Sequence, residues 1–155
     1  MIFQTFVFLC KKFIHSYQAI KEITIFAFCK SFFKPNIETI MKIGDIVHLI
    51  DGQVIEGEQY LDREIDKIFA SDLMSDVLTI DTDEKLMLLT GLANNQSMRT
   101  CEMSDIKNVV FVRGKRITEE MLEIARDNEM VLIQTEYSMY RTAGILYQNE
   151  LPPVY

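Results

Sequence analysis

The second half of the chain alternates short apolar runs with helical patterns, and this alternation restricts the fold more than any other feature. Apolar runs at 85–90, 108–112 and 130–134 are followed by segments of helical spacing at 92–103, from 118 onward and at 137–148. Continuous apolar runs are typical of parallel strands buried on both faces. Repeated strand–helix units imply right-handed crossovers. The sequence therefore predicts an α/β fold with a mostly parallel sheet and flanking helices.

Residues 42–78 have the patterns of shorter helices and strands. Residues 42–50 have the spacing of a short amphipathic helix that ends at Asp51-Gly52, and residues 53–56 predict a strand. An extended segment follows around Ile68. Ser71 is then expected to cap a helix that runs to Leu78, with Asp72 in its first turn.

Composition changes abruptly at Met41. The first forty residues hold eight of the ten Phe, with five Lys and two Glu (5 − 2 = +3). The remainder holds eleven Lys or Arg and twenty-one Asp or Glu (11 − 21 = −10), for a net charge of −7. An acidic chain argues against a nucleic-acid partner, because phosphates favour a basic surface.

Residues 1–40 have several interpretations. Charged residues interrupt every apolar run before the ~18 residues of a transmembrane helix. A signal peptide fits poorly, because no charge precedes the apolar run 2–10 and no small-residue cleavage site follows it. A Phe-rich helix on a membrane surface is one alternative. We favour another, in which translation starts at Met41 and residues 1–40 are a miscalled or poorly ordered extension. The domain then comprises residues 41–155, for which no membrane partner is expected.

Five blocks after Met41 resemble the DRTGG domain family. They are LDREI at 61–65, SDLMSDVL at 71–78, TGLANNQSMRT at 90–100, NVVFVRGK at 108–115 and YSMYRTAGILY at 137–147. The chain is most similar to small stand-alone members that are described as similar to the N-terminal domain of HPr kinase/phosphorylase. The resemblance runs from Met41 to about Gln148 and includes none of residues 1–40.

This resemblance implies a three-layer α/β fold like that of the HPr kinase N-terminal domain and the first domain of Mur ligases. It also implies a regulatory role, because relatives carry the domain beside CBS pairs or phosphotransacetylase domains. Stand-alone relatives occur in anaerobic bacteria, beside iron-only hydrogenase or redox operons. The chain departs from the family's name motif, because Asp62-Arg63 is followed by Glu64 instead of Thr-Gly-Gly.

The residues argue against catalysis. A kinase P-loop needs G-x-x-x-x-G-K-[ST], but Val109 stands five residues before Gly114, and Arg116 follows Lys115. The two histidines, His15 and His48, provide neither a Ser-His-Asp arrangement nor a metal cluster, and His48 is expected on the surface. We therefore expect no enzyme activity and no cofactor.

We expect the cysteines and the acidic residues around Asp72 to have structural rather than catalytic or metal-binding roles. Three isolated thiols suit a reducing, cytoplasmic compartment and supply neither a disulfide framework nor a zinc site. Cys101 is expected to be a packing residue. The carboxylates at 72, 76, 81 and 83 match no calcium-binding loop, so we expect solvated side chains and no metal site.

Polar groups follow each predicted strand. Thr90 and Gly91 precede a helix whose free N–H groups and dipole favour anions, with Asn94 and Asn95 expected in its first turn. Carboxyl ends of parallel strands meet at one sheet edge, where ligands bind in such folds. The other candidate ligand-binding residues at this edge are Ser71, Arg113, Gly114, Lys115 and Thr135. The alternative is that Thr90 and Asn94 cap the helix, while the turn at 113–115 is solvated.

Three functions follow from these observations. The first is a non-catalytic regulatory module that binds a nucleotide or phosphorylated small molecule and works as a homodimer or beside a partner enzyme. The second is an interaction or dimerisation module without a ligand, and the third, which the residues disfavour, is a phosphate-handling enzyme. The apolar tail at 151–155 is expected to cover either a neighbouring subunit or its own domain.

Overall fold

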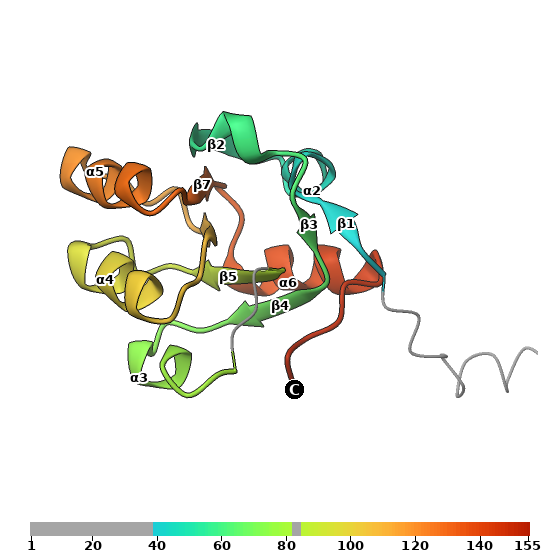
Figure 1. Ribbon diagram of the computed structural model, residues 1–155. Coiled ribbons are helices and arrows are strands. Elements are labelled where there is room, and N and C mark those ends of the chain that lie inside the picture. The colour runs from blue at the N-terminus through green and yellow to red at the C-terminus, as the bar shows by residue number, and fades with distance from the viewer. Residues whose placement is uncertain (1–38, 82–84) are drawn as a thin grey trace, which may run out of the picture. The chain divides into compact units, whose positions relative to one another are not determined.

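A five-stranded sheet lies at the centre of the computed structural model, which describes residues 39–81 and 85–155 (Figure 1). Its strand order is β2-β7-β6-β5-β4. The strands are β2 (Gln53–Glu56), β4 (Lys67–Ala70), β5 (Leu86–Thr90), β6 (Asn108–Phe111) and β7 (Val131–Gln134). Strands β4 to β7 pair in parallel, and β2 pairs antiparallel with β7. The mostly parallel sheet is confirmed, whereas the predictions for residues 1–38 lie outside the described residues.

Helices cover both faces of the sheet, which gives three layers (Figure 1). One face carries α3 (Met74–Val77), α4 (Asn95–Met103) and α5 (Glu119–Asp127). The other carries α2 (Ile43–Leu49) and α6 (Met139–Gln148). A short antiparallel pair, β1 (Met41–Lys42) with β3 (Glu64–Ile65), and a 3-10 turn, η1 (Glu58–Tyr60), complete the described elements.

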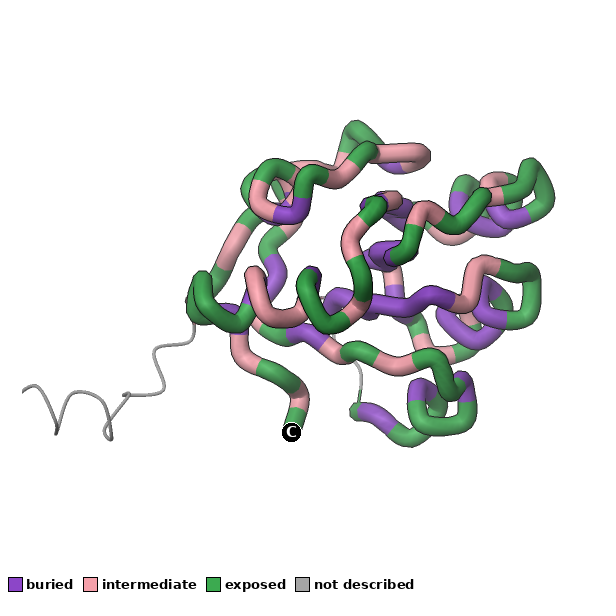
Figure 2. The backbone as a smooth tube through the Cα atoms, turned by 180° about the vertical axis from the view of Figure 1, so that it is seen from behind, coloured by how far each residue is buried: buried purple, intermediate pink, exposed green. Residues whose placement is uncertain are grey.

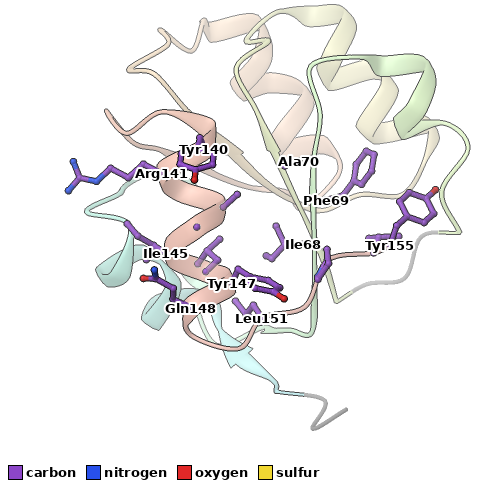
Figure 3. Close-up of a pocket in the computed structure, with 15 residues that line it drawn as sticks. Ile68, Phe69, Ala70, Tyr140, Arg141, Ile145, Tyr147, Gln148, Leu151 and Tyr155 are labelled. Atoms are coloured by element: carbon purple, nitrogen blue, oxygen red, sulfur yellow. The ribbon is translucent and has the colours of Figure 1, made fainter. Parts of the chain in front are cut away.

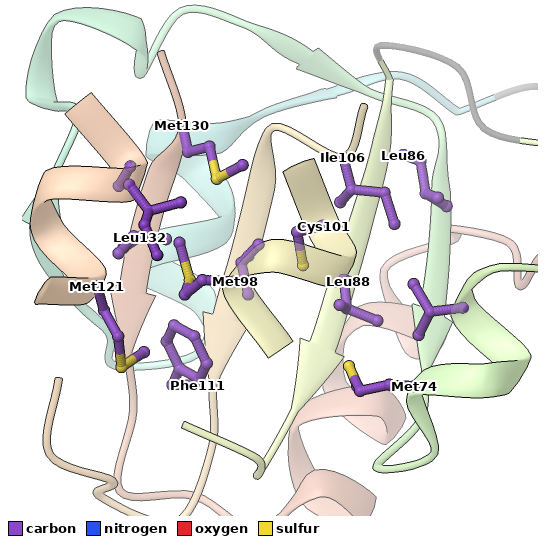
Figure 4. Packing of buried hydrophobic residues seen from close by; sticks show 14 of the residues in the cluster. Met74, Leu86, Leu88, Met98, Cys101, Ile106, Phe111, Met121, Met130 and Leu132 are labelled. Carbon is purple, nitrogen blue, oxygen red and sulfur yellow. The ribbon is translucent and has the colours of Figure 1, made fainter. Parts of the chain in front are cut away.

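The apolar strands supply two cores, because successive side chains of a strand point to opposite faces. In β5, Leu86 and Leu88 pack under α3 and α4, while Met87 and Leu89 pack under α2 and α6. Figure 4 shows the first core, with Phe111 and several methionine side chains between strands and helices. Figure 2 shows buried backbone along the strands and exposed positions on the outer helix faces. An apolar run without alternation is therefore the consequence of two covered faces.

Three helices start two or three residues later than predicted, and one of them is α6, which begins at Met139 rather than at 137. The helix after β4 does not include Asp72, because α3 begins at Met74 with Leu73 as its N-cap. Ser71 caps no helix, and its Oγ instead accepts the Leu73 N–H at 3.0 Å. Asn94 is the N-cap of α4 rather than part of its first turn; its side chain accepts the Ser97 N–H at 2.8 Å in a capping box.

The C-terminal residues lie along β4 of the same chain. The Ile68 N–H donates to the Pro152 carbonyl at 3.0 Å, and the Val154 N–H donates to the Ile68 carbonyl at 3.1 Å. Of the two alternatives for residues 151–155, the tail thus covers its own domain. None of the helices in the described ranges has the length and apolar character needed to span a membrane.

Candidate functional site

The turns after four parallel strands meet at one edge of the sheet, as predicted. Ser71 and Asp72 follow β4, Gly91 follows β5, Arg113 lies just beyond β6, and Thr135 follows β7. Backbone hydrogen bonds attach these turns to the neighbouring segments, because the Ser71 N–H donates to the Leu89 carbonyl in β5 and the Gly114 N–H donates to the Thr135 carbonyl. The parallel register alone brings these segments together.

Asp72 lies at the centre of this edge, where its carboxylate gathers three donors. One oxygen accepts the Gly91 N–H at 2.6 Å and the Thr90 hydroxyl at 3.2 Å. The other accepts a hydrogen bond from Arg113 Nη2 at 2.6 Å. A backbone amide, a hydroxyl and a guanidinium therefore form a cradle for one anionic group, and Asp72 fills it.

Gly91 leaves the space that the Arg113 side chain uses. A Cβ built at residue 91 would overlap the guanidinium group, whose atoms are its three nearest neighbours. A larger residue at this position would therefore push Arg113 away from the cradle.

Arg113 adopts a left-handed backbone with φ of +68°. This conformation costs a residue with a Cβ roughly 1–2 kcal/mol. The Arg113 N–H holds the turn in place by donating to the Tyr137 carbonyl at 2.9 Å. Asp51, Asp105, Glu129 and Glu150 also have a positive φ, so this conformation does not by itself mark Arg113 as a functional residue.

The cradle keeps Asp72 ionised while leaving it accessible. Partial burial acts to raise the pKa of Asp72, but hydrogen bonds from the Gly91 N–H and from Arg113 outweigh it, so the pKa lies below its usual range. The side chains of Arg113 and Asp72 are 47% and 43% exposed. An ion pair this exposed stabilises a fold by at most about 1 kcal/mol. Water and small solutes can therefore reach both partners.

Several predicted site residues have structural partners instead. The Thr135 hydroxyl is buried, donates to the Ile50 carbonyl at 2.8 Å and accepts the Tyr137 N–H at 3.2 Å. Asn94 caps α4, and Asn95 hydrogen-bonds Glu120. The structure thus brings Thr90, Gly91 and Arg113 together at the cradle. The side chains of Thr135, Asn94 and Asn95 have partners elsewhere.

The remaining predicted residues flank the cradle. Gly114 has φ of +56°, and a Cβ there would overlap the Glu136 carboxylate, so the glycine is needed for this turn. Lys115 and Arg116 are exposed in the same connection. The Glu136 carboxylate brings a negative charge beside Gly114.

The contacts of Asp72 were not predicted, because the sequence placed Asp72 in the first turn of a helix capped by Ser71. Its partner Arg113 is 41 positions away, and no local pattern links the two. The described residues contain no cluster of histidine, cysteine or acidic side chains suited to a metal ion. Cys101 is a buried packing residue, as predicted, and its desolvation raises the thiol pKa to about 12.

An apolar groove of about 810 Å³ lies apart from the cradle, between β4, α6 and the C-terminal residues (Figure 3). Tyr140, Tyr147 and Tyr155 line it and are largely exposed. Tyr155 makes an edge-to-face contact with Phe69, with ring centroids 6.1 Å apart. No local pattern in the sequence predicts this groove, because its walls come from three separate segments.

Comparison with known proteins identifies the fold. No family model and no curated protein sequence matches the chain. Among solved structures, the chain is similar to the CBS and DRTGG domains of the regulatory region of Clostridium perfringens pyrophosphatase, complexed with its activator diadenosine tetraphosphate. The TM-score is 0.58 at 13% sequence identity, over 69% of this chain and 46% of that chain.

The similarity therefore covers less than half of that regulatory region. The region that the chain resembles is described as regulatory, and the similarity shows a shared fold. The implied likeness to HPr kinase and Mur ligase domains stays a prediction. The described part of the chain has a DRTGG-like α/β fold.

Proposed function

We propose that this chain is a non-catalytic regulatory module that binds a small anionic ligand at the carboxyl edge of its sheet. The observation that supports this function is the convergence of the Gly91 N–H, the Thr90 hydroxyl and Arg113 on a single carboxylate. Donors arranged in this way suit a phosphoryl or carboxylate group equally. The exposed side chains of Lys115 and Arg116 would add positive charge for a nucleotide or phosphorylated metabolite.

The similar pyrophosphatase region supports this proposal, because that region is complexed with a nucleotide activator. We therefore place nucleotides first among the ligands to test. In this proposal the module acts in the cytoplasm, as a homodimer or beside a partner enzyme. The association with anaerobic redox or hydrogenase systems comes only from the family resemblance, and it is the setting to examine once a ligand is known.

A thermal-shift panel on the full chain tests the proposed function, with adenine nucleotides, diadenosine tetraphosphate, pyrophosphate and phosphate as probes. A ligand that binds only the folded state stabilises it by about 2.7 kcal/mol at a hundredfold excess over Kd, which raises the melting temperature by several degrees. The shift should disappear in the double variant Arg113→Ala/Lys115→Ala. It should persist in Arg99→Ala, since Arg99 pairs with Glu102 on α4 outside the cradle.

A second candidate function is docking of a protein partner or a second copy through the apolar groove beside α6. The observation that favours it is the exposure of Tyr140 and Tyr147 along one groove wall. Exposed aromatic side chains around an apolar depression are typical of interaction sites. If no probe shifts the melting curve, sedimentation velocity of the wild type and of Tyr140→Ala/Tyr147→Ala would test self-association directly.

A further inference from the structure

The Asp72 carboxylate makes no contact that its own helix requires. It precedes α3 by two positions, and Leu73, not Asp72, is the N-cap. Both oxygens instead accept hydrogen bonds from groups at the carboxyl ends of β5 and β6, which are 18 to 41 positions away in the sequence. A side chain that reaches across two neighbouring strands in this way occupies a position that a bound anion would share.

We infer that Asp72 is an internal occupant of the anion cradle, and that an incoming phosphoryl group displaces it and thereby frees the connection between β4 and α3. This inference rests on the function proposed above. A phosphoryl group accepts the same hydrogen bonds from Gly91, Thr90 and Arg113, and it carries more negative charge than one carboxylate. Each donor therefore keeps a hydrogen-bond acceptor after the exchange. The neighbouring Lys115 and Arg116 supply additional positive charge.

The connection that Asp72 holds is suited to respond. α3 is only four residues long, and it is fixed to the core by the buried side chains of Met74 and Val77. Between β4 and α3, the backbone has the Ser71–Leu89 hydrogen bond and the Ser71 Oγ contact with the Leu73 N–H. Release of Asp72 removes the only charged tether described for this connection. Ligand binding at the sheet edge would therefore alter α3, which is flanked by the exposed side chains of Leu73 and Leu78.

Isothermal titration of the full chain with inorganic pyrophosphate tests the inference. Asp72→Asn, which keeps the size of the side chain, and Asp72→Ala, which removes it, should both bind pyrophosphate at least tenfold more tightly than the wild type. A tenfold gain corresponds to a cradle that is free of Asp72 in about one wild-type molecule in ten. Asp76→Asn is the matched control, because it removes one negative charge from the same segment without a contact to the cradle.

Hydrogen exchange supplies an independent measurement. Saturating pyrophosphate should speed amide exchange in residues 71–78 of the wild type, and Asp72→Ala should exchange rapidly there without ligand.

Two results would overturn the inference. If the wild type binds pyrophosphate through Arg113 but the Asp72 variants bind no more tightly than Asp76→Asn, the internal-occupant idea is wrong while the anion site stands. If neither the wild type nor the Asp72 variants bind pyrophosphate, the anion site itself is refuted, and the inference with it.

Discussion

Replacing Gly91 with alanine tests whether the Arg113 guanidinium lies against the turn after β5. The three atoms nearest to a Cβ at this position all belong to that guanidinium, and the backbone of Gly91 does not have a positive φ. Alanine therefore fits the main chain, and the strain falls on the flexible end of Arg113. The side chain of Arg113 must swing away, which breaks its contact with Asp72.

Two effects of opposite sign set the size of the change. Loss of an ion pair that is almost half exposed costs about 0.2–1 kcal/mol. A glycine-to-alanine change at a compatible backbone stabilises by about 0.4–1 kcal/mol, because it restricts the unfolded chain. In the wild-type background these effects nearly cancel. In an Arg113→Ala background only the second effect remains, so Gly91→Ala should stabilise the fold.

A double-mutant cycle in urea separates the two effects. We expect a coupling free energy between Gly91→Ala and Arg113→Ala of up to about 1 kcal/mol, equivalent to at most about 4 °C in melting temperature. As a control, Gly57→Ala should destabilise in either background, because Gly57 has φ of +86° and its Cβ would lie 2.6 Å from the Met130 carbonyl oxygen. Free energies for Gly91 and Arg113 that add within about 0.3 kcal/mol would refute the placement of the guanidinium.

Three further predictions follow from burial and charge. Phe111→Ala should destabilise by about 3–5 kcal/mol in urea, because the ring is fully buried in the core under α4 and α5; a loss below about 1 kcal/mol would contradict that packing. Cys101 should resist iodoacetamide at pH 8 in the native chain by peptide mapping, since burial raises its pKa to about 12; rapid labelling would show that the site opens. The pKa of Asp72, followed by carboxyl NMR, should lie below its ordinary value of about 3.9 and should rise in Arg113→Ala. Because the pKa of Asp72 is lower in the folded state than in the unfolded state, the ion pair stabilises the protein above about pH 4. This contribution to stability is lost as the pH falls through the folded-state pKa. An unchanged pKa in the variant would show that Arg113 does not hold the carboxylate.

The sequence alone determined the class of fold and the location of the candidate site. The apolar runs in β5 and β6 do not alternate with polar residues, so both faces of these strands must be buried. Burial on both faces is typical of parallel strands that are connected by helices. From that order it follows that the turns after β4, β5, β6 and β7 share one edge. These inferences depend on the order of strands and helices and not on where a helix begins, so they remain correct although α3 and α4 begin later than predicted.

Tertiary structure decided which groups at that edge are engaged and with what. Asp72 and Asn94 both had the spacing of helix-start residues, yet Asn94 caps α4 and Asp72 binds Gly91 and Arg113 across the sheet. The antiparallel direction of β2 and the pairing of the C-terminal residues with β4 were equally beyond local patterns. The physical reason is that an exposed carboxylate binds whichever donors lie within hydrogen-bond distance, and the pairing of the strands determines which donors those are.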